Sequence, residues 1–190
     1  MSETQPPRPE QGLFTGPRRV EAIADLFANI WQLGYVTSDL DGGIALMEAK
    51  FGLEHCVKLP TGGGTFLVGD EPAEWDARFA MGSRGGLIVE LIEPVAGAIE
   101  FYTRILPADG SLAVRLHHVA TFVETGDQEW QRIRRLLAAS GLGFDYTLLI
   151  PGRVRAGYVD TTAELGHFLE ICQLERDDID FFSALTTDSA

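Results

Sequence analysis

Apolar and polar residues follow two different periods along this chain, and each period predicts one kind of element. Alternation with period two predicts strands, and apolar stripes at three- and four-residue spacing predict helices. The first such stripe predicts an N-terminal helix over residues 20–30. A strand is predicted over 31–38, and the helix after it can be capped by Asp39 and ended by Gly52.

The remainder of the first half predicts strands only. Their ranges are 54–60, 74–81 and 86–94, with turns at 62–64 and 82–86. The three glycines of the first turn have no Walker lysine beside them and open no helix, so a hairpin turn explains them better than a phosphate-binding loop. The first half therefore has the order strand, helix and about three strands.

The second half repeats this order. A strand is predicted over 114–124, and Asp127 can cap the helix that follows. The apolar stripe of that helix consists of Trp130, Ile133 and Leu137. The three strands predicted next cover 144–150, 154–161 and 167–174. We interpret the two halves as an internal repeat of one supersecondary unit.

The repeat sets the domain boundaries that we expect. The first module covers 31–94 and the second 114–174, with a connector of weak helical character over 95–113. Residues 1–19 are polar and rich in proline, which predicts a disordered tail. Residues 175–190 predict an acidic C-terminal tail.

Two of the predicted strands carry a glutamate in the middle of an apolar run. Glu90 lies in GGLIVELIEP and Glu170 in GHFLEICQ, each on a face that it shares with apolar side chains. A lone ionised carboxylate in such surroundings costs several kcal/mol, on the order of the penalty for a buried charge, unless a positive group meets it. We therefore interpret the two glutamates as halves of one metal site.

The strand that opens each module adds a side chain with a donor atom for a metal. Gln32 opens the first module and His118 the second, and each is followed two positions later by a small residue, Gly34 or Ala120, on the same face. Two carboxylates would neutralise a dication, and an imidazole and an amide would add neutral donors. The candidate ligands are therefore Gln32, Glu90, His118 and Glu170.

Taken singly, these residues have ordinary explanations. A glutamine on a strand is usually polar surface, and His118 could be a hydrogen-bonded core histidine. The two glutamates could instead pair with an arginine such as Arg84 or Arg115. His117 is predicted to point to the opposite face of its strand, so we assign only His118 to the metal.

Charge and composition narrow the partners. The 190 residues carry a net charge of −13 and a pI near 4.6, which argues against nucleic acid and against an anionic membrane surface. No apolar run approaches the roughly 20 residues of a membrane span, and residues 1–12 lack the apolar core of a signal peptide. We expect a cytoplasmic protein whose two cysteines, Cys56 and Cys172, are reduced.

Four segments give the chain a resemblance to the vicinal oxygen chelate superfamily, the group of glyoxalases, bleomycin-resistance proteins and extradiol dioxygenases. They read QLGYVTSDLDGGIALMEAKFGL, IVELIEP, LHHVATFVE and DTTAELGHFLEICQL, within Trp31 to Leu174. The phrase LHHVATFV is similar to the corresponding strand of methylmalonyl-CoA epimerases. The resemblance implies an α+β fold in which two tandem βαβββ modules form a partly open, eight-stranded barrel around one metal ion.

The resemblance also implies the chemistry. The family's ligand positions fall on Gln32, Glu90, His118 and Glu170, the ligand order of zinc-type glyoxalase I. It implies one divalent ion, zinc first, with Ni, Co, Mn, Mg or Fe as alternatives. By the same analogy Glu170 is the candidate catalytic base and Glu90 a second one. Gln32 stands where extradiol dioxygenases have a histidine, which argues against ring cleavage, and the glutathione-binding residues of glyoxalase I are not recognised.

The leading hypothesis is a metal-dependent lyase or isomerase that stabilises the enolate of a carbonyl substrate. The alternatives are a small-molecule-binding protein of the bleomycin-resistance type and a scaffold without a site. The substrate is expected to be small and partly apolar, a ring compound or a coenzyme A thioester, and a homodimer is common in the family. The candidate substrate contacts are Phe122, Tyr158 and Phe168.

Overall fold

The computed structural model describes residue 17 and residues 19–60 and 64–187. In chain order the elements are η1 (Ile23–Phe27), β1 (Ile30–Thr37), α1 (Leu40–Phe51), β2 (Glu54–Leu59), β3 (Thr65–Val68), β4 (Glu71–Ala73), β5 (Trp75–Arg84), β6 (Leu87–Gly97), α2 (Glu100–Thr103), β7 (Val114–Phe122), α3 (Asp127–Ala139), β8 (Tyr146–Ile150), β9 (Val154–Val159), α4 (Thr162–Leu165), β10 (Phe168–Leu174) and α5 (Arg176–Thr187).

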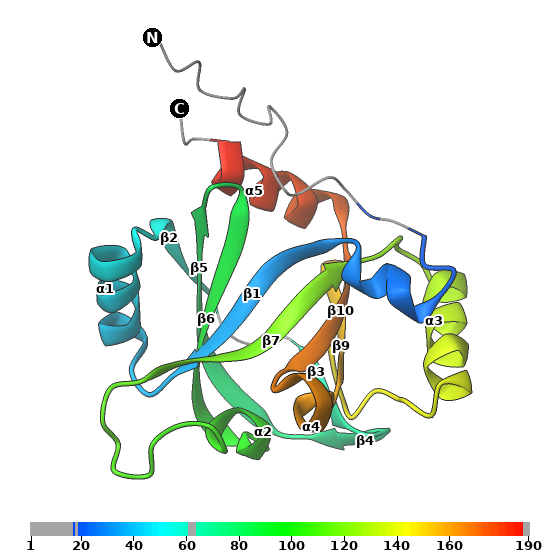
Figure 1. Cartoon of the computed structure of the whole chain (residues 1–190), viewed down its shortest axis with the longest axis horizontal. Coiled ribbons are helices and arrows are strands. Elements are labelled where there is room, and N and C mark those ends of the chain that lie inside the picture. The colour runs from blue at the N-terminus through cyan, green and yellow to red at the C-terminus, as the bar shows by residue number, and fades with distance from the viewer. Residues whose placement is uncertain (1–16, 18, 61–63, 188–190) are drawn as a thin grey trace, which may run out of the picture.

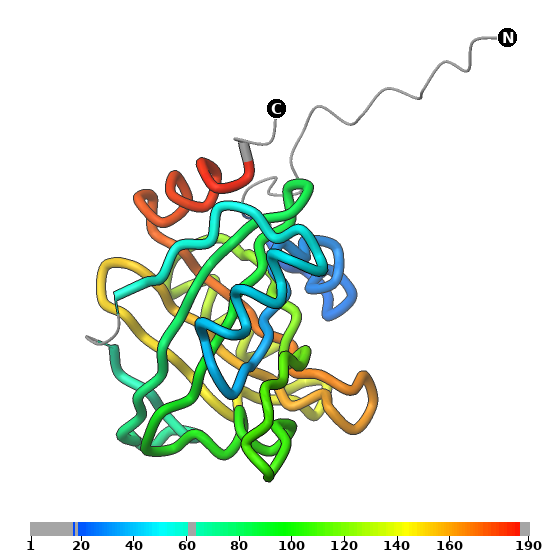
Figure 2. The backbone as a smooth tube through the Cα atoms, turned by 90° about the vertical axis from the view of Figure 1, so that its left-hand side faces the viewer, coloured from blue at the N-terminus to red at the C-terminus, as the bar shows by residue number. Residues whose placement is uncertain are grey.

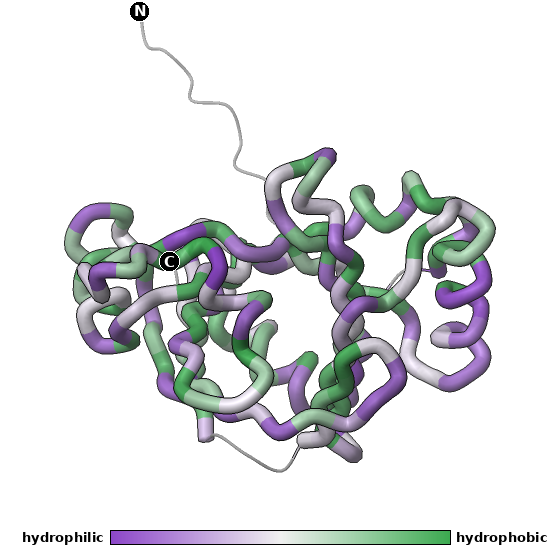
Figure 3. Tube along the Cα trace, turned by 90° about the horizontal axis from the view of Figure 1, so that it is seen from below, coloured by the Kyte–Doolittle hydropathy of each residue, from purple (hydrophilic) through white to green (hydrophobic). Residues whose placement is uncertain are grey.

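The strands form one sheet in the order β2-β5-β6-β1-β7-β10-β9-β8-β3-β4. The sheet curls around a central axis, with α1 and α3 on its outer side (Figures 1 and 3). The two halves repeat the same pairing, since β6 runs parallel to β1 and β10 runs parallel to β7. Where the modules meet, β1 and β7 pair antiparallel. The predicted α+β fold of two βαβββ modules is confirmed, with ten strands instead of eight.

The two additional strands are β3 and β4, a hairpin inserted between β2 and β5 that the sequence analysis did not anticipate. The hairpin belongs to the first module in sequence. It nevertheless pairs through β3 with β8 of the second module, and so extends the sheet at that edge. Most of the turn expected at 62–64 lies outside the described residues. The turn expected at 82–86 is shorter, because β5 continues to Arg84 and only Gly85 and Gly86 turn, both with positive φ.

Both predicted helices of the modules form. Asp39 caps α1 by accepting a hydrogen bond from the backbone N–H of Asp41, and Gly52 ends it in the left-handed conformation with φ of 64°. Asp127 is the first residue of α3 and not its cap, which is Gly126. The stripe expected on α3 is buried against the outside of the second half, where Ile133 and Leu137 pack together with residues of β9 and β10.

The segments outside the modules differ from the sequence analysis where the structure describes them, and most of the tail predicted over 1–19 lies outside the described residues. In the range 20–30 the helix is a short 3-10 turn, Ile23–Phe27, and β1 begins at Ile30. The acidic end of the chain forms α5, which lies across one end of the barrel, opposite the end where α2 of the connector sits (Figures 1 and 2). In the described part of the chain, no helix is long and apolar enough to cross a membrane.

Candidate metal centre

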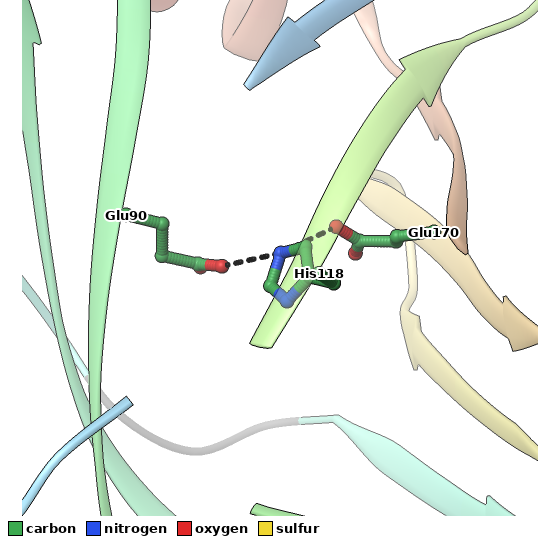
Figure 4. Close-up of side chains that lie close together, drawn as sticks. All are labelled: Glu90, His118 and Glu170. Carbon is green, nitrogen blue, oxygen red and sulfur yellow. Dashed lines mark ion pairs between the residues drawn. The ribbon is translucent and has the colours of Figure 1, made fainter. Parts of the chain in front are cut away.

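Four neighbouring strands carry the four side chains that the sequence analysis selected. Gln32 comes from β1, Glu90 from β6, His118 from β7 and Glu170 from β10. These strands are consecutive in the sheet, and its curl brings the two glutamates to opposite sides of the His118 ring (Figure 4). All four residues are buried.

The distances between the donor atoms suit a metal ion. Nε2 of His118 lies 3.3 Å from Oε2 of Glu90 and 3.0 Å from Oε2 of Glu170. One donor atom from each of the three residues lies within 4.8 Å of the other two. Two ligands at zinc distances and tetrahedral angles are about 3.3 Å apart. The Glu90–His118–Glu170 group can therefore hold one ion. Arg84, which the sequence analysis considered as an alternative partner of the glutamates, pairs with Glu54 instead.

Two of these donor atoms lack hydrogen-bond partners. Within the residues that the structure describes, Nε2 of His118 and Oε2 of Glu170 are buried and make no hydrogen bond. Their close approach thus does not have hydrogen-bond geometry. Buried polar atoms without a partner are rare and costly, and a cation between the imidazole and the carboxylates would satisfy both. The donor set and these two atoms fit a divalent metal.

Gln32 is at the site but turns its amide nitrogen toward it. Nε2 of Gln32 donates a hydrogen bond of 2.9 Å to Oε2 of Glu90. An amide binds a metal through its oxygen, so a 180° turn of the amide is required before Gln32 can be a ligand. In this orientation Gln32 holds Glu90 in place.

His117 does not lie on the opposite face, and that prediction was wrong. Gly34 of β1 pairs with His118 and Tyr35 pairs with Leu116, so His117 is an extra residue in β7 and forms a β-bulge. The bulge interrupts the alternation of side chains. It places Nδ1 of His117 3.1 Å from Nδ1 of His118, and Nε2 of His117 3.1 Å from the carbonyl oxygen of Phe101.

Tyr158 and Cys172 lie beside Glu170 in the sheet. Tyr158 is its direct partner in the pairing of β9 with β10, and Cys172 follows two positions later on β10. Cys172 and Cys56 are both free, as expected. Glu90 accepts a side-chain hydrogen bond from Gln32.

These contacts separate the acidities of the two carboxyls. Burial raises the pKa of Glu90, and the charge of His118 offsets this only in part. Burial also acts to raise the pKa of Glu170, but the charge of His118 lowers it overall. Burial opposes a charge on His118, yet the two carboxylates raise its pKa to about 10. Burial lowers the pKa of His117 well below its ordinary value, so His117 is neutral.

A cavity of about 270 Å³ adjoins the centre on the side of α5. Gln32, Glu90 and Glu170 form part of its wall, as does Tyr158, one of the three predicted substrate contacts. The other two lie in the core: Phe122 packs on Trp31 and Phe168 on Phe101. Lining residues that the sequence analysis missed are Trp75, Phe79, Arg153, Asp178 and Phe182.

The opposite end of the barrel is filled with aromatic side chains. Phe101 of α2 stacks on Tyr146 and on Phe66, with ring centroids 4.1 and 5.6 Å apart, and packs against the edge of Phe168. Phe101 and Tyr102 are almost completely buried. Access to the carboxylates is therefore from the α5 side.

Comparison with solved structures agrees with the observed fold. No protein-family model matches the sequence, and no curated protein matches it. Among solved structures, methylmalonyl-CoA epimerase from Mycobacterium tuberculosis superposes with a TM-score of 0.53 and 13% identity, over 80% of this chain and 91% of that chain. This chain has the vicinal oxygen chelate fold.

Two further structures share the fold. A methylmalonyl-CoA epimerase in complex with methylmalonyl-CoA and ammonium superposes with a TM-score of 0.50 and 18% identity, over 77% of this chain and 94% of that chain. A hypothetical protein from Bacillus halodurans C-125 has a TM-score of 0.50 and 17% identity over the same shares. These superpositions establish the vicinal oxygen chelate fold. At identities this low they do not establish the chemistry, which has to be argued from the side chains.

Proposed function

We propose that this protein is a metal-dependent enzyme that moves a proton next to a carbonyl group, an isomerase or epimerase in the first instance. The observation that carries the proposal is Nε2 of His118, buried between two carboxylates at the wall of a cavity. The ligands are Glu90, His118 and Glu170, with the oxygen of Gln32 added once its amide turns. A divalent ion there, zinc first, would polarise a carbonyl oxygen and stabilise an enolate.

The two carboxylates differ as bases. Burial acts to raise the pKa of Glu170, but the charge of His118 lowers it overall, which makes Glu170 the weaker proton acceptor. Burial raises the pKa of Glu90, and general-base catalysis favours the carboxylate with the higher pKa. We therefore assign the removal of the proton to Glu90, with Glu170, first expected to be the base, placed for transfer at the opposite face.

The cavity indicates the class of substrate. Its wall is mainly apolar and aromatic, and Trp75, Phe79 and Phe182 line it together with Glu90 and Glu170. An apolar wall with a few converging polar groups is typical of small-molecule sites. A carbonyl compound with a ring or a branched chain suits this wall, and a coenzyme A thioester, as in the epimerase complex above, would enter acyl end first.

The test combines metal content with proton exchange. Purified protein is analysed by elemental mass spectrometry, then incubated in D2O with methylmalonyl-CoA or 2-phenylpropanal, and loss of the proton next to the carbonyl is followed by NMR. We expect about one divalent ion per chain and exchange that Glu90→Gln abolishes. Glu54→Gln, which removes a surface carboxylate paired with Arg84, is the control.

Two results would overturn the proposal. A protein that binds no divalent ion, even after incubation with zinc, nickel or manganese, has no metal centre. A protein that binds an ion and both compounds but exchanges no proton supports the binding-protein alternative instead.

A further inference from the structure

The short helix α2, in the connector between the modules, begins a hydrogen-bond chain that reaches the candidate metal centre. The carbonyl oxygen of Phe101 lies 3.1 Å from Nε2 of His117, and Nδ1 of His117 lies 3.1 Å from Nδ1 of His118. The chain therefore ends on a metal-ligand candidate.

The direction of this chain follows from donor chemistry. A carbonyl oxygen can only accept, so Nε2 of His117 carries a hydrogen. If His117 also carried one on Nδ1, it would be a cation, 2% exposed, with no carboxylate in contact in the described part of the chain. Burial of such a charge is costly. Nδ1 of His117 therefore accepts, and Nδ1 of His118 donates.

The chain thus runs from the connector toward the centre. With Nδ1 of His118 directed at His117, Nε2 is the imidazole nitrogen that lies beside Glu90 and Glu170. A divalent ion bound there would replace the proton that Nε2 carries when His118 is charged.

We propose that His117 is a positioning residue, which fixes His118 with its hydrogen on Nδ1 and so presents Nε2 to a divalent ion. This inference rests on the metal centre of the proposed function. It extends that centre to His117 and to Phe101 of the inter-module connector, neither of which is among the proposed ligands of the ion.

The first measurement needs no metal. In uniformly 15N-labelled, metal-free protein, a hydrogen bond between two imidazole nitrogens gives a coupling between them across the bond. We expect this coupling between Nδ1 of His117 and Nδ1 of His118. Its absence would overturn the inference, even if the protein binds zinc. If the coupling is present and no ion binds, the proposed function fails and the donor order stands.

The second measurement is zinc affinity by competition with a chelating dye. We expect His117→Phe to weaken binding about 10–100-fold, the usual cost of losing a partner of a metal-ligating histidine. His117→Gln, whose amide oxygen can accept from Nδ1 of His118, should recover most of the affinity.

His167→Phe is the matched control, since His167 is hydrogen-bonded to the backbone of Phe168 and takes no part in the chain from Phe101 to His118. Equal affinity of His117→Phe and the wild type would overturn the inference. So would equal losses in His117→Phe and His117→Gln, because loss of packing and not loss of an acceptor would then explain the effect. Circular dichroism identifies any variant that fails to fold, and the coupling measurement then decides.

Discussion

The ring of His118 rests on the backbone of Gly34: a Cβ added to Gly34 would lie 1.8 Å from Cε1 and 2.0 Å from Nε2 of the imidazole. The two residues are direct partners in the pairing of β1 with β7. No side chain can be accommodated at position 34 unless the imidazole moves, so the position of the metal-binding nitrogen depends on this glycine.

Gly34→Ala should therefore displace His118 and impair the metal centre. Overpacking of a filled site typically costs about 1–3 kcal/mol, and we expect a loss of stability in this range together with loss of zinc binding. Urea denaturation and chelator competition measure the two effects. Gly143→Ala, at a glycine whose added Cβ would meet nothing within 4 Å, should change neither. Unchanged zinc affinity in Gly34→Ala would show that the imidazole does not need this space.

Stability of the metal-free protein should depend on pH through His118. The two carboxylates raise the pKa of His118 from 6.5 to about 10, so the folded state binds this proton more tightly than the unfolded state. The stabilisation is complete below about pH 6.5 and is lost as the pH rises through 10. The difference in urea midpoint between the wild type and His118→Asn should shrink over this range. A difference that is constant from pH 6.5 to 10 would contradict the assignment.

The grouping of Glu90, His118 and Glu170 could be predicted because the strands of the two glutamates alternate regularly. Strict alternation places Glu90 and Glu170 among apolar side chains, and the repeat matches the opening strands that carry Gln32 and His118. The alternation fails at His117, because this residue is the extra one of a β-bulge in β7. A bulge has no signature in composition, so the contact between the two histidines could not be anticipated.

Long-range pairing and packing explain the other differences. The β3–β4 hairpin pairs with a strand of the other module, and no local pattern specifies a partner so far along the chain. In contrast, the sequence does contain a pattern that predicts α5, since the apolar residues Ile179, Phe182 and Leu185 recur every three residues. The acidic composition of the segment obscured this stripe, which packs against the barrel.

The two glutamates should respond differently to the same substitution. Glu90→Gln removes the stronger base, and we expect a loss of proton exchange of about 10²–10⁴-fold, the usual contribution of a general base. Glu170→Gln removes the more anionic ligand, and it should weaken zinc binding more than Glu90→Gln does. Exchange rates at saturating zinc separate the two effects. Equal loss of exchange in both variants at full zinc occupancy would contradict the division of work between them.

The C-terminal helix should contribute to stability and to the cavity together. Phe182 of α5 is 5% exposed, contacts the ring of Trp31 with centroids 4.9 Å apart, and forms part of the cavity wall. Removing a buried phenylalanine side chain typically costs about 3–5 kcal/mol, so Phe182→Ala should lower the free energy of unfolding by this amount. Phe181→Ala, at its partly buried neighbour, should cost less. Trp31 directly precedes Gln32 on β1, so Phe182→Ala should also weaken zinc binding. A variant that loses stability but keeps its zinc affinity would show that α5 only closes the barrel.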